Sequence, residues 1–225
     1  EAIAHQLQDG ITFTLPHELE VEVAERIVAN VPCAEMVRFA KSGSDATSAA
    51  VRLARAITGR DHVIVAGYHG WHDWYVGSTS RHLGVPDAER ALVPTVAPFD
   101  VEALRATLDA SADRVAAVVL EPIGAADPDP AYLRAAVDLT RAAGALAIFD
   151  EVISGFRVAM GGAQERYDVT PDLAAFGKAL GNGMPISALA GPAAHMSVLE
   201  DVFFSGTHGG EALSLAAARA TLDTL

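Results

Sequence analysis

The sequence predicts an α/β domain in which a mostly parallel sheet lies between two layers of helices. Along the 225 residues, segments with helical periodicity alternate with short apolar segments. The apolar segments, such as Val115 to Leu120 and Ala145 to Phe149, lack polar alternation, which is typical of strands buried on both faces of a parallel sheet. Hydrophobic residues make up 51% of the chain and aromatic residues only 6%. Small aliphatic side chains therefore fill the interior, which suits helices packed on a sheet.

Each element of this sheet and its helices has its own sequence signal. Helices are predicted over residues 15–30, 44–58, 101–108 and 132–143 and from 211 to the end, and strands over 36–39, 62–65, 115–120, 145–149, 173–176 and 187–190. The first helix carries Leu19, Val23 and Ile27 at helical spacing. Ser44 is expected to cap the second helix, with Asp45 favourably placed in its first turn.

Composition limits what the chain can do. A formal charge of −13 argues against nucleic acid or an anionic membrane as partner, because both require a basic face. The longest apolar runs are too short to cross a bilayer, and the N-terminus does not read as a signal peptide. Cys33 is the single cysteine, so no disulfide framework is possible and a cytoplasmic location is expected.

The chain reads as one domain over residues 1–225, without a linker or an internal repeat. It lacks an initiator Met and opens inside a helical pattern. We therefore expect it to be a fragment of a longer protein.

Polar residues follow several predicted strands, where open α/β sheets bind ligands. Ser42, Gly43 and Ser44 precede a helix, so their N–H groups and hydroxyls can bind an anion, although for these residues taken alone an ordinary capped turn is the favoured explanation. Asp150 follows a buried strand and either pairs with a cationic ring nitrogen or is a solvated strand-end carboxylate.

Only two of the 16 basic residues are lysines. Lys178 has apolar or glycine neighbours, which predicts desolvation, a lowered pKa and a nucleophilic amine, against the alternative of a surface lysine on a glycine loop. Lys41 abuts the Ser-Gly-Ser turn and is expected to hold an anion or to face solvent. His69 and His72 lack the further ligands of a metal shell, so we predict no metal and instead a loop that stacks on a ring.

Together these parts predict one ligand. An anion-binding turn, a ring-stacking loop, a buried acid and a lysine in apolar surroundings would hold a phosphorylated, cationic aromatic aldehyde. Pyridoxal 5'-phosphate (PLP) is that molecule.

The same residues carry a resemblance to a known family. The chain resembles the class III aminotransferases of PLP fold type I, and within them the glutamate-1-semialdehyde aminomutase-like branch. The matching motifs occur in family order at Val37 to Ala46, Gly67 to Gly70, Leu120 to Pro122, Phe149 to Arg157, Phe176 to Pro185 and Gly206 to Gly210. One departure follows Glu121-Pro122, where the sequence continues Ile123-Gly124-Ala125-Ala126 and lacks the polar residue common in the aminomutases. The second departure is extent: the chain covers only about the central half of a family member, so the resemblance implies that residues 1–225 are the PLP-binding large domain without the N-terminal segment and the C-terminal small domain.

The resemblance implies a role for each matching residue. Lys178 would form the Schiff base with PLP and shuttle protons, and Asp150 would pair with the pyridinium nitrogen. The other implied cofactor-binding residues are Ser42, Gly43 and Ser44 at the phosphate, Val152 and Tyr68 on the two ring faces with His69 beside them, and Glu121 nearby. Thr207 would reach the phosphate of the neighbouring subunit, which implies a homodimer.

The implied activity is amino-group transfer between a small-molecule amino donor and a carbonyl acceptor. Intramolecular transfer, as in an aminomutase, and racemisation are alternatives on the same scaffold. A core that acts only in assembly and a nucleotide-binding α/β domain are alternatives from other classes, and the last leaves Lys178 and Asp150 unexplained.

Overall fold

A computed structural model describes residues 1–124 and 127–225. Its helices are α1 (Ala2–Asp9), α2 (Glu18–Asn30), α3 (Gly43–Thr58), α4 (Asp73–Val76), α5 (Asp87–Arg90), α6 (Val101–Ser111), α7 (Pro130–Ala142), α8 (Gly162–Tyr167), α9 (Ala193–Met196) and α10 (Ala212–Leu222). Short 3-10 turns lie at η1 (Ala112–Arg114), η2 (Lys178–Gly181) and η3 (Ser197–Glu200). The strands are β1 (Met36–Ala40), β2 (His62–Ala66), β3 (Val115–Leu120), β4 (Leu146–Glu151), β5 (Leu173–Phe176) and β6 (Ser187–Gly191).

Within the described residues these strands form one six-stranded sheet in the order β1-β6-β5-β4-β3-β2. Strands β2 to β5 pair in parallel, and β6 is antiparallel to both β5 and β1. The prediction of a mostly parallel sheet is confirmed. Because β1 runs in the same direction as β2 to β5, the carboxyl ends of these five strands meet at one edge of the sheet.

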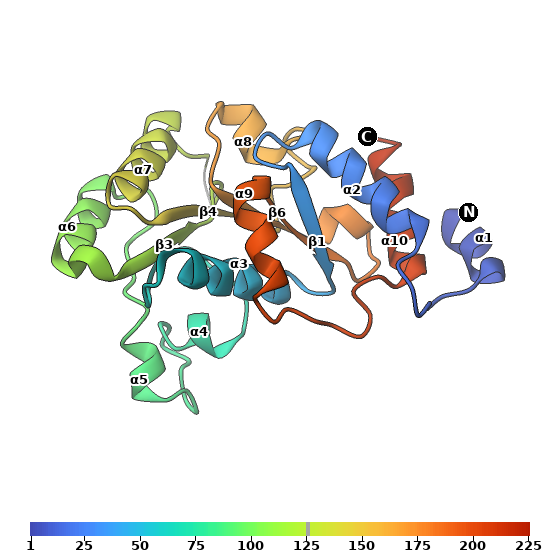
Figure 1. Cartoon of the computed structure of the whole chain (residues 1–225). Coiled ribbons are helices and arrows are strands. Elements are labelled where there is room, and N and C mark those ends of the chain that lie inside the picture. Colours follow the sequence, from blue (N-terminus) through green and yellow to red (C-terminus); the bar gives the residue numbers. More distant parts are fainter. Residues whose placement is uncertain (125–126) are drawn as a thin grey trace.

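Helices cover both faces of the sheet, which gives the three layers predicted from the sequence (Figure 1). The pleat divides each strand between the faces: Ala117, Val119 and Ile148 pack against α3, whereas Val118 and Phe149 pack with α6 and α7. Helices α2 and α10 cover the β5–β6 end of that second face. Figure 1 shows the two ends of the chain close to α10.

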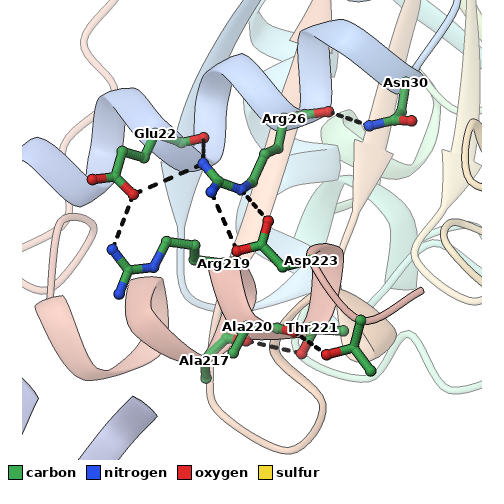
Figure 2. A network of polar contacts seen from close by, with 9 residues as sticks. Glu22, Arg26, Asn30, Ala217, Arg219, Ala220, Thr221 and Asp223 are labelled. Carbon is green, nitrogen blue, oxygen red and sulfur yellow. Dashed lines mark hydrogen bonds and ion pairs between the residues drawn. The ribbon is translucent and has the colours of Figure 1, made fainter. Parts of the chain in front are cut away.

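Helices α2 and α10 are also joined by charged side chains (Figure 2). Arg26 Nε lies 2.6 Å from Asp223 Oδ1, and an Arg219 guanidinium nitrogen lies 3.0 Å from Glu22 Oε2. All four side chains are partly exposed, so each pair stabilises the fold by only about 0–1 kcal/mol. The apolar contacts of α2 and α10 with the sheet therefore carry the packing of these two helices.

The start of α3 differs from the prediction. Ser42, and not Ser44, is the N-cap: its hydroxyl accepts the Asp45 N–H at 3.2 Å, and the Asp45 carboxylate accepts the Ser42 N–H at 2.8 Å. This reciprocal capping box needs an acid three residues after the cap, a spacing that Ser42 has and Ser44 lacks. Ser44 lies inside the helix and is buried.

Candidate active site

A cavity of about 340 Å³ lies at the strand edge just described. Loops after β1, β2, β3, β4 and β5 line it, and they bring together residues that are far apart in the sequence, such as Lys41 and Lys178. All of the predicted cofactor-binding residues except Ser42 and Thr207 lie on its wall: Gly43, Ser44, Tyr68, His69, Glu121, Asp150, Val152 and Lys178. A larger cavity of about 630 Å³ between α2, β1 and residues 204–210 has neither lysine on its wall, so we do not consider it a candidate for lysine chemistry.

His69 and Asp150 form a buried pair on the cavity wall. His69 Nδ1 lies 2.9 Å from Asp150 Oδ2, and the two residues are 1% and 6% exposed. The second carboxylate oxygen accepts the Val152 N–H at 3.2 Å. Among the described residues, His69 Nε2 has no hydrogen-bond partner. A buried carboxylate fixed by two donors can present negative charge to a cationic group in the cavity.

The predicted anion site falls at the first turn of α3. Ser42 caps the helix from outside the cavity, whereas Gly43 and Ser44 line it. Thr47, one turn further on, was missed by the sequence reasoning. Its hydroxyl donates to the carbonyls of Ser44 and His69 at 3.2 and 3.0 Å, which fixes α3 against the loop after β2. Its spacing of three residues from Ser44 places both on one helix face, and that signal could have found it.

Val152 is held between two glycines. A Cβ added at Gly43 would lie 2.8 Å from Val152 Cγ1, and one added at Gly177 would lie 3.3 Å from the same atom. The backbones of α3 and of the β5 loop can therefore approach Val152 only because both residues lack a side chain. This packing fixes an aliphatic side chain on the cavity wall, where it can contact the face of a flat ring.

Glu121 fixes the loop that carries Tyr68. Its Oε2 accepts the Tyr68 N–H at 2.9 Å, and Gly67, with φ of 118°, leaves room for this carboxylate. Tyr75 donates its hydroxyl to the Gly67 carbonyl at 2.9 Å and contacts the Tyr68 ring edge-on at 5.6 Å. Tyr68 is itself 58% exposed. Glu121 thus acts on the backbone that presents the Tyr68 ring.

Lys178 lies where predicted but not in the predicted surroundings. It lines the cavity and is exposed, so the expected desolvation of its amine is wrong for this chain. Its apolar neighbours Phe176 and Leu180 are buried in the core instead. Lys178 also has φ of 34°, in the left-handed region that non-glycine residues rarely adopt and that recurs at functional sites.

Lys41 neither stands free for an anion nor simply faces solvent. Its Nζ lies 3.0 Å from Glu211 Oε2 and 3.1 Å from Ser214 Oγ. Burial by itself would raise the pKa of Glu211, but hydrogen bonds from Ser214, Lys41 and the Leu213 N–H together lower that pKa. The pair joins the β1–α3 loop to the start of α10 and occupies the Lys41 amine.

Glu151 is a buried acid whose role the sequence did not reveal. It is fully buried, and burial raises its pKa. Its carboxylate accepts hydrogen bonds from Ser154 Oγ at 2.8 Å, from the Ala163 N–H at 2.6 Å and from Gln164 Nε2 at 3.1 Å. Successive residues of a strand point to opposite faces, so Asp150 faces the cavity while Glu151 fixes the segment that follows.

Two predicted residues lie away from the cavity, and part of the departure from the family pattern falls outside the described residues. Ser42 is the external cap of α3, and Thr207 is exposed in the segment before α10. Ala125 and Ala126, part of the departure after Glu121-Pro122, lie outside the described residues. Over residues 1–124 and 127–225, no group of three or more potential ligands could hold a metal, and no helix is long and apolar enough to cross a membrane.

The site thus defines a class: an α/β protein that gathers the start of a helix, a buried carboxylate and a lysine at one sheet edge. The family model for aminotransferase class-III matches residues 1–225, and the chain belongs to this family.

Named relatives agree with this assignment. A glutamate-1-semialdehyde 2,1-aminomutase from Methanothermobacter thermautotrophicus is 43% identical over 100% of this chain and 57% of its own length. A 3-aminobutyryl-CoA aminotransferase from Cloacimonas acidaminovorans is 38% identical over 100% and 56%. The crystal structure of an omega-transaminase from Sphaerobacter thermophilus superposes with a TM-score of 0.93 at 32% identity, over 100% and 57% of the two chains. The chain therefore spans a little over half the length of these relatives.

Proposed function

We propose that this chain is the cofactor-binding large domain of a PLP-dependent aminotransferase. The observation that carries the proposal is that Lys178, the buried Asp150 and the start of α3 line one cavity. The donor set fits PLP: the α3 N-terminus suits its phosphate, the Asp150 carboxylate suits its pyridinium nitrogen, and Val152 offers an apolar surface to its ring. One solved structural neighbour at 31% identity is described as a transaminase with PLP bound, with a TM-score of 0.94.

Each residue of this chain then has a defined task. The Lys178 amine would bond to the aldehyde carbon and afterwards carry the proton that leaves the substrate's Cα. His69 would hold the Asp150 carboxylate in place, Gly43 and Ser44 would bind the phosphate together with the Ser42 cap, and Tyr68 would cover the ring. The bound cofactor would supply an electron sink for the amino-bearing carbon.

Assembly and location belong to the same proposal. Thr207 is exposed and outside the cavity, which is compatible with a contact to the phosphate in a neighbouring subunit of a homodimer. The substrates would be a small-molecule amino donor and a carbonyl acceptor. The single cysteine, buried and free, is compatible with a cytoplasmic location.

The test uses the fact that only two lysines are present, both on the cavity wall. The chain is incubated with PLP, reduced with borohydride, and its modified peptide is mapped by mass spectrometry. We expect a pyridoxyl adduct on Lys178 that Lys178→Met abolishes and Lys41→Met retains. No adduct, or an adduct on Lys41 alone, would contradict the proposal.

An aminomutase is the second candidate, because the 43% identical relative bears that name. The two candidates differ in their requirement for a partner substrate. An aminotransferase needs a separate carbonyl acceptor to regenerate its cofactor, whereas an aminomutase completes its cycle on one molecule. Multiple turnovers of a single amino compound without an added carbonyl acceptor would establish the second candidate.

A further inference from the structure

The loop between η2 and β6 contains an Asn-Gly pair, Asn182-Gly183, at the edge of the candidate active site. Gly183, Met184 and Pro185 line the candidate active-site cavity, and Asn182 lines a neighbouring cavity of about 330 Å³. Both residues of the pair are exposed, and the turn that leads into them begins at Lys178. A chemical change at Asn182 would therefore act on the wall of the candidate active site.

The peptide group that joins Asn182 to Gly183 is free of hydrogen bonds, although the backbone on either side of it is held. The Asn182 N–H donates to the Ala179 carbonyl at 3.0 Å, and the Met184 N–H donates to the Gly181 carbonyl at 3.0 Å. Among the described residues, neither the Gly183 N–H nor the Asn182 carbonyl has a partner within the chain. A Cβ added at Gly183 would meet nothing within 4 Å. This peptide plane can therefore turn without breaking a hydrogen bond.

A half-turn of this peptide plane would bring two reactive atoms together. Asn182 has φ of 44° and ψ of 45°, which places the Gly183 nitrogen on the far side of the Cα–C bond from the Asn182 side chain. Gly183 has φ of 108°, and glycine adopts φ of either sign with little cost. The half-turn changes ψ of Asn182 and φ of Gly183 together, and it moves the nitrogen to the same side as Asn182 Cγ. From that position the nitrogen and Cγ can close a succinimide ring.

We propose that Asn182 is a site of spontaneous deamidation on the edge of the candidate active site. The Gly183 nitrogen loses its proton to solvent and attacks Asn182 Cγ, the bond from Cγ to the side-chain nitrogen breaks, and ammonia leaves. Water then opens the cyclic imide at either of its carbonyls, which gives aspartate or isoaspartate. Both products add a negative charge next to Gly183, and isoaspartate also lengthens the main chain of the loop that follows Lys178. The inference does not depend on the proposed function.

Asn30 provides a comparison within the same chain, because it is the other asparagine of the sequence. Its side-chain Nδ2 donates to the Arg26 carbonyl at 2.8 Å, and the N–H of the following Val31 donates to the Ile27 carbonyl at 2.8 Å. Ring closure at Asn30 requires both of these hydrogen bonds to break. Asn30 should therefore be protected as long as the chain is folded.

The variant Asp9→Asn provides a matched control, because Gly10 follows position 9 and the variant has a second Asn-Gly pair. In this pair the glycine N–H is not free, since Gly10 donates it to the Gln6 carbonyl at 3.1 Å. The substitution itself should be mild: Asp9 is exposed and its carboxylate lies 3.9 Å from His5 Nε2. The variant thus separates the effect of the dipeptide sequence from that of the hydrogen bond on its peptide group.

The test incubates Asp9→Asn in buffer and in urea and maps its peptides by mass spectrometry over time. Deamidation is detected as the mass change of an amide that becomes a carboxylic acid. In urea, positions 9 and 182 should convert at similar rates because glycine follows both. In buffer, the rate at position 182 should stay within about tenfold of its rate in urea, a factor that corresponds to about 1.4 kcal/mol. Position 9 should convert more slowly than position 182 in buffer, and Asn30 should stay unmodified.

A rate at position 182 in buffer that is more than about tenfold below its rate in urea would overturn the inference, because the folded chain would then protect Asn182. Conversion of position 9 in buffer as fast as position 182 would also overturn it, since the free peptide group would have no effect. Asn182→Gln should remove the mass change from its peptide, and a change that persists there would assign the reaction to another residue and overturn the inference. The lysine adduct experiment decides the proposed function separately.

Discussion

The buried pair of His69 and Asp150 should contribute to stability even without a cofactor. The pair is tested by a double-mutant cycle of His69→Leu and Asp150→Asn. A hydrogen bond to a charged group contributes about 1.5–3 kcal/mol and one between neutral groups about 0.5–1.5 kcal/mol. Asp150 borders a cavity that water can enter, so we take the low end and expect a coupling energy of about 1–1.5 kcal/mol.

The assay is urea unfolding of the wild type, the two single variants and the double variant at neutral pH. The chain offers a matched control in His72 and Asp45, whose Nε2 and Oδ1 atoms are 3.9 Å apart and whose side chains are 32% and 35% exposed. The control cycle of His72→Leu and Asp45→Asn should give a coupling of about 0–0.5 kcal/mol, because exposed ion pairs contribute little. A coupling at His69 and Asp150 no larger than this control would refute the reasoning.

Three further predictions follow from individual contacts. Gly43→Ala should lower stability by about 1–3 kcal/mol because its Cβ would lie 2.8 Å from Val152 Cγ1, and Val152→Ala should restore much of this loss in thermal unfolding. Lys41→Met should cost about 1 kcal/mol at pH 7. The folded-state pKa of Glu211 is lowered, so the stabilisation from its ionised carboxylate is present above the unfolded-state pKa and is lost as pH falls through the folded-state pKa. The free energies of unfolding of the wild type and of Lys41→Met should therefore converge in acid. Burial raises the pKa of the Cys33 thiol to about 12, so iodoacetamide at pH 8 should label it only in urea; rapid labelling of the folded chain would contradict this.

The strands of the sheet could be predicted because the apolar pattern that indicates each strand lies within its own segment of the sequence. Val115 to Leu120 is apolar throughout and is the strand β3 with those bounds, and Leu173 to Phe176 is β5. The direction of β6 was not predictable in this way. Its sequence lacks polar alternation, as do the sequences of the parallel strands, and strand direction depends on the path of the connection from β5, which has no periodicity to read.

The candidate site could be located because the polar residues after the strands are few. The contacts that these residues make within the chain were harder to predict. Lys41 was expected at an anion or in solvent, and its partner Glu211 lies 170 residues further along the chain. A pairing over that separation exists only once α10 has packed beside the β1–α3 loop, so no local pattern could indicate it.

Lys178 shows most clearly how sequence neighbours and spatial neighbours differ. Its apolar flanks predicted a desolvated amine, yet Phe176 and Leu180 point into the core while Lys178 is exposed at the cavity. The apolar residues on either side of Lys178 therefore indicate which part of the backbone is packed in the core, and the left-handed φ of Lys178 turns its side chain away from them. If this amine becomes desolvated, the groups that exclude water from it must come from a ligand in the cavity or from another part of the assembled protein. The amine should then become more nucleophilic when the cavity is filled than when it is empty.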